Sequence, residues 1–320
     1  MSGTTQLDFR VRGFKERLGY RDVVIHMGGD LSANNPDVGD VPPIYERTDL
    51  SDQLWIGHLD ADTAKIIMET CEPKALGLTP PARQRAHLYA FVRELPSDSE
   101  ILWWDTDHQL TAAVAVSRLI RPTSIGFAYA ARVGIESGAV KEVLPAEIRG
   151  ISRDAFLSPS RTRDWLTRGD AEGLRQLVPL LWSQLPRRVH NALWHHEYAA
   201  RTYYLDHRWT LVVTGLEALV HTDRRHSTAQ FTGRVTKLAS ELGITLSDAD
   251  AREAYNLRSQ LAHGAAFLSA GTATGLSRSQ VELYDRLEDT LRLAVLRGMR
   301  DQAFADIMDS DDKIRGHWPI

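Results

Sequence analysis

An arginine and a histidine five residues apart, Arg258 and His263, are the residues of this sequence best suited to act together chemically. A guanidinium group binds phosphate and stabilises negative charge, and a histidine can carry a proton near neutral pH. Both lie in the stretch 247–264, SDADAREAYNLRSQLAHG, where the final glycine is the usual C-terminal stop of a helix. The pattern predicts a helix over 248–263 whose end could bind a phosphate and move a proton.

Arg258 lies within the apolar stripe of this predicted helix. Counted from Ala251, it stands at spacing seven, between apolar residues at spacings three, four, ten and eleven. These are Ala254, Tyr255, Leu261 and Ala262. A guanidinium that points at a helical core is costly unless a carboxylate, a phosphate or a water-filled cleft receives it. The sequence therefore predicts a partner for Arg258.

A glutamate on an upstream predicted helix, Glu217, is the candidate partner. The helix over 202–221 has an apolar stripe, and Glu217 lies at its edge, four residues after Val213. The stripe consists of Trp209, Val212, Val213, Leu216 and Val220. Where two antiparallel helices pack, a glutamate in that position can reach an arginine on the facing stripe. Two interpretations stay open, a structural ion pair or part of a functional site.

The spacing between Arg258 and His263 constrains how the two could cooperate. Five residues of α-helix turn through about 140° and rise about 7.5 Å, so the two side chains do not share one face. Either the last turn unwinds before Gly264, or a second copy of the chain completes the site. The second possibility predicts a homodimer, because symmetric pairing is the commonest form of oligomer.

The stretch 209–264 resembles a HEPN domain of the ApeA-like branch. The resemblance rests on a helix carrying Leu216-Glu217, on Arg234 within TGRVTKLAS, and on the sequence Leu-Arg-Ser-x-x-x-His-Gly at 257–264. The Arg-x4-His spacing is that of the family motif. The resemblance implies an all-helical, metal-independent endoribonuclease without a cofactor, acting as a homodimer with active sites at the pairing interface. Such proteins often belong to bacterial antiviral defence or toxin–antitoxin systems.

The resemblance also implies a role for each motif residue. Arg258 would contact the scissile phosphate, His263 would be the general base or acid at the ribose 2′-hydroxyl, and Glu217 would orient Arg258. RNA carries its own nucleophile, so cleavage needs only proton transfer and charge stabilisation. Ser259 departs from the family pattern, in which Asn, Asp or His often follows the arginine.

A basic segment over 221–237 could guide RNA toward this motif. Its cations are Arg224, Arg225, Arg234 and Lys237. The strip could bind a phosphate backbone, although a solvated loop followed by a helix start would have the same composition. Tyr255, one turn before Arg258, is either a core residue or a residue that stacks on a base. With Ser259, these residues make up the expected RNA contacts.

A group of histidines, His190, His195 and His196 beside Glu197, suggests a metal site at first glance. However, neighbouring histidines point in different directions on a helix, residues five apart do not stack, and the sequence has no His-Glu-x-x-His motif. We expect these to be surface or interface residues, with no metal bound. No nucleotide-binding signature occurs either.

The composition is that of an ordinary globular protein, with 320 residues, a formal net charge of -4 and one cysteine, Cys71. This length allows two domains with cores, and the charge does not favour generic nucleic-acid or membrane binding. A lone cysteine excludes a disulfide framework and fits a reducing compartment. Neither a signal-peptide core nor a run of about eighteen apolar residues occurs. We therefore expect a cytoplasmic protein with no membrane segment.

The elements that would position the motif fall into two parts. Residues 1–165 predict a mixed α+β domain, with helices at 60–71 and 107–120 and strands at 22–29, 53–59, 87–95, 101–105 and 124–135. After a polar boundary segment at 151–170, residues 166–305 predict an all-α HEPN-like bundle. Its helices are expected near 171–185, 187–221 with a break at Ala200, 229–242, 248–263 and 279–305. Residues 306–320 are expected to form a loosely held tail.

These patterns together predict a metal-independent endoribonuclease of HEPN type with RNA as its substrate. The N-terminal domain would then sense a trigger or bind an antitoxin. The alternative is a non-catalytic HEPN-like module that binds RNA or a protein, in which Arg258 and Glu217 form only a structural pair.

Overall fold

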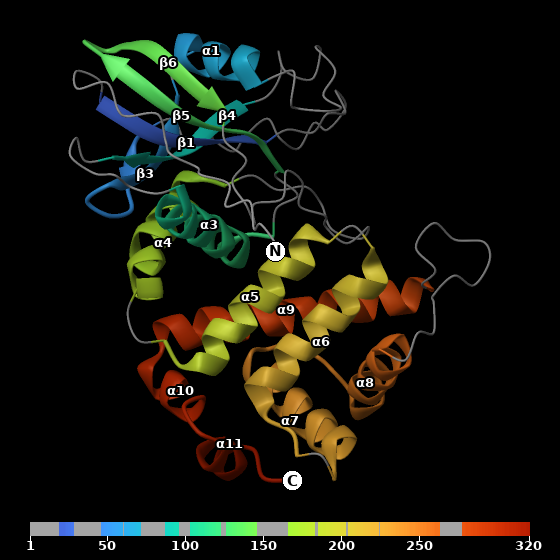
Figure 1. Ribbon diagram of the computed structural model, residues 1–320. Helices are drawn as coiled ribbons and strands as arrows, with labels where there is room; N and C mark the ends of the chain where they lie inside the picture. Colours follow the sequence, from blue (N-terminus) through green and yellow to red (C-terminus); the bar gives the residue numbers. More distant parts are fainter. Residues whose placement is uncertain are drawn as a thin grey trace, which may run out of the picture.

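The computed structural model has an antiparallel sheet in its N-terminal part and a mostly helical C-terminal part (Figure 1). It describes residues 19–28, 46–59, 61–71, 87–95, 103–122, 126–145, 166–182, 185–202, 204–223, 225–262 and 277–320. This arrangement agrees with the predicted order of an α+β region followed by a helical region.

The sheet has the strand order β2-β3-β4-β1-β5-β6 in the described part of the chain, and each pair of neighbours is antiparallel. The strands are β1 (Gly19–Gly28), β2 (Thr48–Asp49), β3 (Leu54–His58), β4 (His87–Glu94), β5 (Gly126–Glu136) and β6 (Ala139–Pro145). Helices α1 (Ala61–Cys71) and α3 (Trp103–Ile120) cover opposite faces. Along β4, Ala90 and Val92 join the core under α1 and Phe91 joins the core under α3, following the two-residue period of a strand.

One prediction for the N-terminal part was wrong, and one strand was missed. Residues 103–105, predicted as strand from their aromatic content, belong to the 18-residue helix α3. The helical pattern of the residues that follow overrides the local strand preference. Strand β6 was not predicted; it pairs with β5 through a tight turn in which Ser137 and Gly138 have φ values of 52° and 81°. Positive φ at two successive turn residues is what a two-residue hairpin of type I′ requires.

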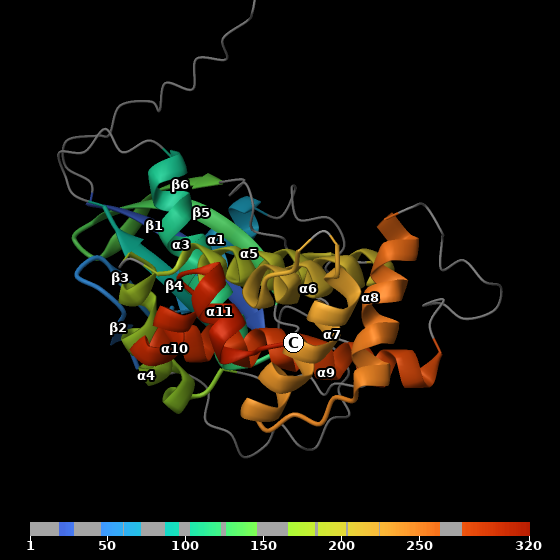
Figure 2. The same ribbon diagram turned by 90° about the horizontal axis from the view of Figure 1, so that it is seen from below.

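The C-terminal part is a helical bundle (Figures 1 and 2). Its elements are α4 (Arg168–Leu177), the 3₁₀ helix η3 (Val178–Trp182), α5 (Arg187–Arg201), α6 (Leu205–Val220), α7 (Ser227–Glu241), α8 (Asp248–Ala262), α9 (Arg278–Arg300), α10 (Gln302–Ile307) and α11 (Asp311–His317). The predicted break near Ala200 is confirmed, because α5 ends at Arg201 and α6 begins at Leu205.

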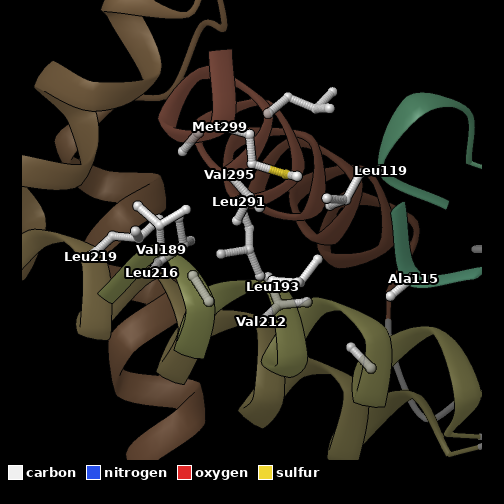
Figure 3. Close-up of a cluster of buried hydrophobic side chains, with 14 of the residues drawn as sticks. Ala115, Leu119, Val189, Leu193, Val212, Leu216, Leu219, Leu291, Val295 and Met299 are labelled. Atoms are coloured by element: carbon white, nitrogen blue, oxygen red, sulfur yellow. The ribbon is translucent and has the colours of Figure 1, made fainter. Parts of the chain in front are cut away.

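Helix α6 lies at the centre of this bundle. Its predicted apolar stripe is fully buried, and Figure 3 shows Val212, Leu216 and Leu219 among side chains of α5 and α9. Gly215 permits the close approach of these helices. A methyl group there would lie 2.9 Å from Leu291 Cδ2 and 3.1 Å from the Cβ of His195. Any larger residue at position 215 would push α5 or α9 away from α6.

Helix α3 joins the sheet to the bundle, so the expected boundary near residue 165 is not a break in the core. Its other side contributes Ala115 and Leu119 to the cluster that contains Leu193 and Leu291 (Figure 3). One continuous apolar core therefore runs from β4 through α3 into the helices. Two domains with separate cores were expected because the polar segment 151–170 resembles a linker.

The prediction that residues 306–320 form a loosely held tail was also wrong. Within it α11 forms, and the side chain of Trp318 is almost completely buried. The Trp318 indole donates a hydrogen bond of 2.7 Å to Glu241, at the end of α7. Figure 2 shows the end of the chain lying beside α7. The acidic composition suggested solvation, but the buried side chains of Ile314 and Trp318 and the hydrogen bond to Glu241 dock the segment.

In the part of the chain that the structure describes, no helix combines the length and apolar character needed to cross a membrane.

The docking of the last segment gives a first prediction, on stability. We expect Trp318→Ala to lower the free energy of unfolding by about 3–5 kcal/mol, because it empties a packed site and leaves Glu241 without its indole donor. Urea unfolding measures this change. Lys313→Ala in the same short helix is the control, and its exposed side chain should cost less than about 0.5 kcal/mol. Equal effects of the two substitutions would show that the segment is not docked.

Candidate functional site

The expected contact between Glu217 and Arg258 is present. Nη2 of Arg258 donates to Oε2 of Glu217 at 2.9 Å, joining α8 to α6. The other carboxylate oxygen of Glu217 accepts from the Tyr255 hydroxyl at 3.2 Å and from the Thr222 hydroxyl at 2.9 Å. Both oxygens of Glu217 are therefore engaged, and the carboxylate is fixed in place.

The two helices that carry this pair are held together by buried contacts. The Trp209 indole of α6 donates to the carbonyl oxygen of Ala254 in α8 at 3.1 Å. The Tyr255 ring packs on Phe231 of α7 with ring centroids 5.0 Å apart, and the Arg258 guanidinium carbon lies 5.8 Å from the centroid of Tyr255. Arg258 is thus positioned by a carboxylate and by an aromatic face.

The pair lies at the edge of the core and not inside it. The side chains of Arg258 and Glu217 keep 27% and 20% of their surface exposed. A guanidinium has five N–H donors, and the carboxylate that pairs with Arg258 in the described part of the chain takes one of them. The site can therefore receive a phosphate oxygen from solvent without breaking the ion pair.

Two of the predicted site residues, His263 and Arg224, lie outside the described residues. Helix α8 is described as far as Ala262, so the predicted unwinding or pairing at its end stays a prediction. Ser259 and Arg225 are described, and Ser259 is half-buried beside Arg258 while Arg225 is exposed. The structure therefore brings Arg258, Glu217 and Tyr255 together from the predicted set.

The sequence position of Arg234 suggested that it belongs to a surface strip that binds RNA, but the structure places it elsewhere. Its side chain is almost completely buried, and it donates to the carbonyl oxygens of Val220, His221 and Trp318. Burial lowers the pKa of this guanidinium. Arg234 satisfies the carbonyl groups at the end of α6 and anchors the last residues, which is a structural role.

Lys237 and Tyr255 also have partners inside the protein. The Lys237 ammonium group donates to the carbonyl oxygen of Pro319, although its side chain is exposed. Tyr255 is buried, and its hydroxyl donates to Glu217. Of its two predicted roles, core residue or base-stacking residue, the structure therefore supports the first. Of the predicted strip, Arg225 is the described cation without such a structural contact.

His196 and Glu197, which were expected to be surface or interface residues, lie inside the protein. Both are buried, and Glu197 pairs with Arg118 of α3 at 2.6 Å and lies 3.6 Å from Arg201. Burial raises the pKa of the Glu197 carboxyl group, and Arg118 and Arg201 oppose that shift. The described residues contain no group of three or more His, Cys, Asp or Glu placed to hold a metal ion. Arg118 was missed, although its lone charge at the end of an apolar helix gives the same signal as Arg258.

A groove of about 750 Å³ lies between α4 and η3, the start of α5, and the junction of α9 and α10. Its lining includes two arginines, Arg187 and Arg300, and two aspartates, Asp306 and Asp309. No sequence pattern indicated this groove, because its residues come from four segments that meet only in the folded chain.

Comparison with known proteins found no relative, because no protein family, curated protein or solved structure matches this chain.

The ion pair gives a second prediction, for a double-mutant cycle. With Glu217→Gln, Arg258→Met and the double variant, we expect a coupling free energy of about 1 kcal/mol from urea unfolding, because the pair is only partly exposed. The solvent-exposed pair Arg278–Glu282 is the control and should couple more weakly. Additive effects of Glu217→Gln and Arg258→Met would contradict the contact.

The packing of His195 gives a third prediction, on pH. Burial lowers the pKa of His195, so its imidazole binds a proton less readily in the folded state than in the unfolded state. The stabilisation is present above the unfolded pKa of about 6.5 and is lost as pH falls through the folded pKa. Between pH 7.5 and 5, the free energy of unfolding should therefore fall more steeply in wild type than in His195→Gln, by at most about 1.4 kcal/mol per pH unit.

Urea unfolding at a series of pH values measures this difference, with His207→Gln on the neighbouring helix as the matched variant at an exposed position. Parallel pH profiles for wild type and His195→Gln would contradict the prediction.

Proposed function

We propose that this protein is a metal-independent endoribonuclease of HEPN type. The observation that carries the proposal is the position of Arg258. Its guanidinium is held by Glu217, keeps part of its surface open to solvent, and stands five residues before His263. The resemblance of the stretch 209–264 to HEPN domains suggests which reaction this arrangement would catalyse, namely RNA cleavage.

The chemistry needs only what these residues supply. His263 removes the proton of a ribose 2′-hydroxyl, and the 2′-oxygen forms a bond to the adjacent phosphorus while the bond from phosphorus to the 5′-oxygen breaks. The leaving 5′-oxygen takes up a proton, and a 2′,3′-cyclic phosphate remains. Arg258 stabilises the negative charge that develops on the phosphate oxygens. Glu217 is a positioning residue, because it acts through Arg258.

The proposal includes a homodimer and an upstream signal. In an uninterrupted α-helix, Arg258 and His263 would be separated by about 140°, so a second copy of the chain is one way to complete the site. The sheet shares its core with the bundle through α3, so a trigger or antitoxin bound to the N-terminal part has a packed route to the helices. The single cysteine fits a reducing compartment such as the cytoplasm, where RNA is present.

A second candidate function is a non-catalytic module that binds RNA or a protein. The observation that favours it is the full engagement of Glu217, whose oxygens also hold Tyr255 and Thr222. On this alternative Arg258 stabilises the contact between α6 and α8 and has no substrate. It predicts that Arg258→Ala lowers the melting temperature and that no RNA is cleaved.

Cleavage of single-stranded RNA in excess EDTA tests the proposal. We expect products ending in 2′,3′-cyclic phosphate or 3′-phosphate, and no cutting of an oligonucleotide of the same sequence made of DNA. Arg258→Ala and His263→Ala should each reduce the rate by about 100-fold or more, because each removes a group that acts in the transition state. Glu217→Gln should reduce it less, because the arginine remains.

Arg252→Ala is the matched control, since Arg252 is an exposed arginine on the same helix and should be dispensable. Circular dichroism shows whether each variant keeps its fold. A requirement for metal, or unchanged cutting by folded Arg258→Ala and His263→Ala, would refute the assignment.

A further inference from the structure

One face of α5 carries a row of three rings, of which His190 and Tyr198 are exposed and Trp194 is half-buried against the edge of the core. His190, Trp194 and Tyr198 follow one another at spacings of four residues, so they lie on one face of the helix. Their ring centroids are 6.2 Å apart at each step, and the Trp194 indole donates to His190 Nε2 at 3.1 Å. Tyr198 keeps 48% of its surface exposed. The opposite face of α5 holds the residues that pack into the core.

The same face carries an exposed positive charge, Arg187, at the N-terminal end of the row. Arg187 stands one turn before His190, and Arg201 lies over the Tyr198 ring with its guanidinium carbon 4.9 Å from the centroid. The acidic residue of α5, Glu197, is buried and pairs with Arg118. Arg201 is largely buried and also lies 3.6 Å from the Glu197 carboxylate, so Arg187 is the cation of this row that is exposed to solvent.

Arg187 also lines the groove of about 750 Å³ at the start of α5, together with Arg300. Among the described residues, neither of these two guanidinium groups pairs with a carboxylate. Of the two aspartates that share the groove, Asp309 pairs with Lys313, whereas Asp306 accepts a hydrogen bond from the neutral Gln302 amide and keeps its charge. Arg187 therefore places positive charge beside the row of rings and in a recess that also holds Arg300 and two carboxylates.

The spacing of the rings selects the kind of polyanion. Four residues of helix rise about 6 Å, whereas successive bases along one strand of duplex DNA are only about 3.4 Å apart. Rings at this interval match a strand whose bases are unstacked from each other and lie on aromatic side chains. A duplex keeps its bases stacked and offers them no contact with an exposed helix face of this kind.

We propose that the outward face of α5 is a binding platform for single-stranded nucleic acid, with bases stacked on Trp194 and Tyr198 and the backbone attracted by Arg187. The platform is separate from the ion pair of Glu217 and Arg258, since α6 lies between α5 and α8 and packs on both. It goes beyond the proposed cleavage, because it binds a strand without requiring a 2′-hydroxyl.

Fluorescence anisotropy with a labelled 12-nucleotide oligothymidylate tests the platform. This DNA strand lacks the 2′-hydroxyl, so the proposed chemistry cannot cleave it. We expect wild type to bind it more tightly than a 12-base-pair duplex. Tyr198→Ala should raise Kd about 5- to 100-fold, and Tyr198→Phe should leave it unchanged, because stacking needs the ring and not the hydroxyl.

The salt dependence of Kd tests the role of the Arg187 charge. Arg187→Glu should weaken binding and lower the slope of log Kd against log salt by about 0.7, the value for one lost phosphate contact with a single strand. Arg278→Glu makes the same change of charge at an exposed position on α9 and should leave both quantities near wild type.

Three results would overturn the platform: an unchanged Kd for Tyr198→Ala, equal affinity for strand and duplex, or an unchanged salt slope for Arg187→Glu. Light scattering tests the other occupant, a second copy of this chain. A wild-type dimer that becomes a monomer in Tyr198→Ala would assign the face to self-association and overturn the proposal. Failure here leaves the ribonuclease proposal standing, because the cleavage assay depends on Arg258 and His263.

Discussion

The ion pair between Arg118 and Glu197 is the constraint on which the rest of the structure depends. The two side chains are almost completely removed from water and lie 2.6 Å apart. A buried charge without its partner costs several kcal/mol, so α3 and α5 can be correctly placed only together. Because α3 also covers one face of the sheet, the pair ties the sheet to the bundle, and the two parts share one apolar core.

Helix α6 then fixes the candidate site. Gly215 brings α5 and α9 close to one side of it, and the Trp209 indole binds the backbone of α8 on another. These contacts leave little freedom for the position of Glu217, so the carboxylate lies where the Arg258 guanidinium of α8 can reach it. The geometry of the pair therefore follows from packing around α6, and a substitution at Gly215 would disturb it from a distance.

Helical periodicity was sufficient to predict the contact between Glu217 and Arg258, because both residues hold calculable positions on long helices. It was not sufficient for Arg118 and Glu197, which are 79 residues apart in the sequence and meet only through the packing of α3 on α5. Composition misled at Arg234, since a basic segment looks the same whether its cations face solvent or bind carbonyl groups at a helix end. The same limit applies to Trp318, whose burial depends on the surface of α7.

Two arginine–glutamate pairs of the same chemistry thus occupy this bundle with different consequences. Arg118 is enclosed, so no ligand can approach its guanidinium, and its role is confined to holding α3 against α5. Arg258 has a carboxylate partner at a similar distance but lies at the edge of the core, where solvent screening makes the pair a weak source of stability. A fixed guanidinium that contributes little to stability and remains open to solvent is suited to binding an anion. It is already oriented, so a phosphate that binds there does not bear the entropy cost of ordering the side chain.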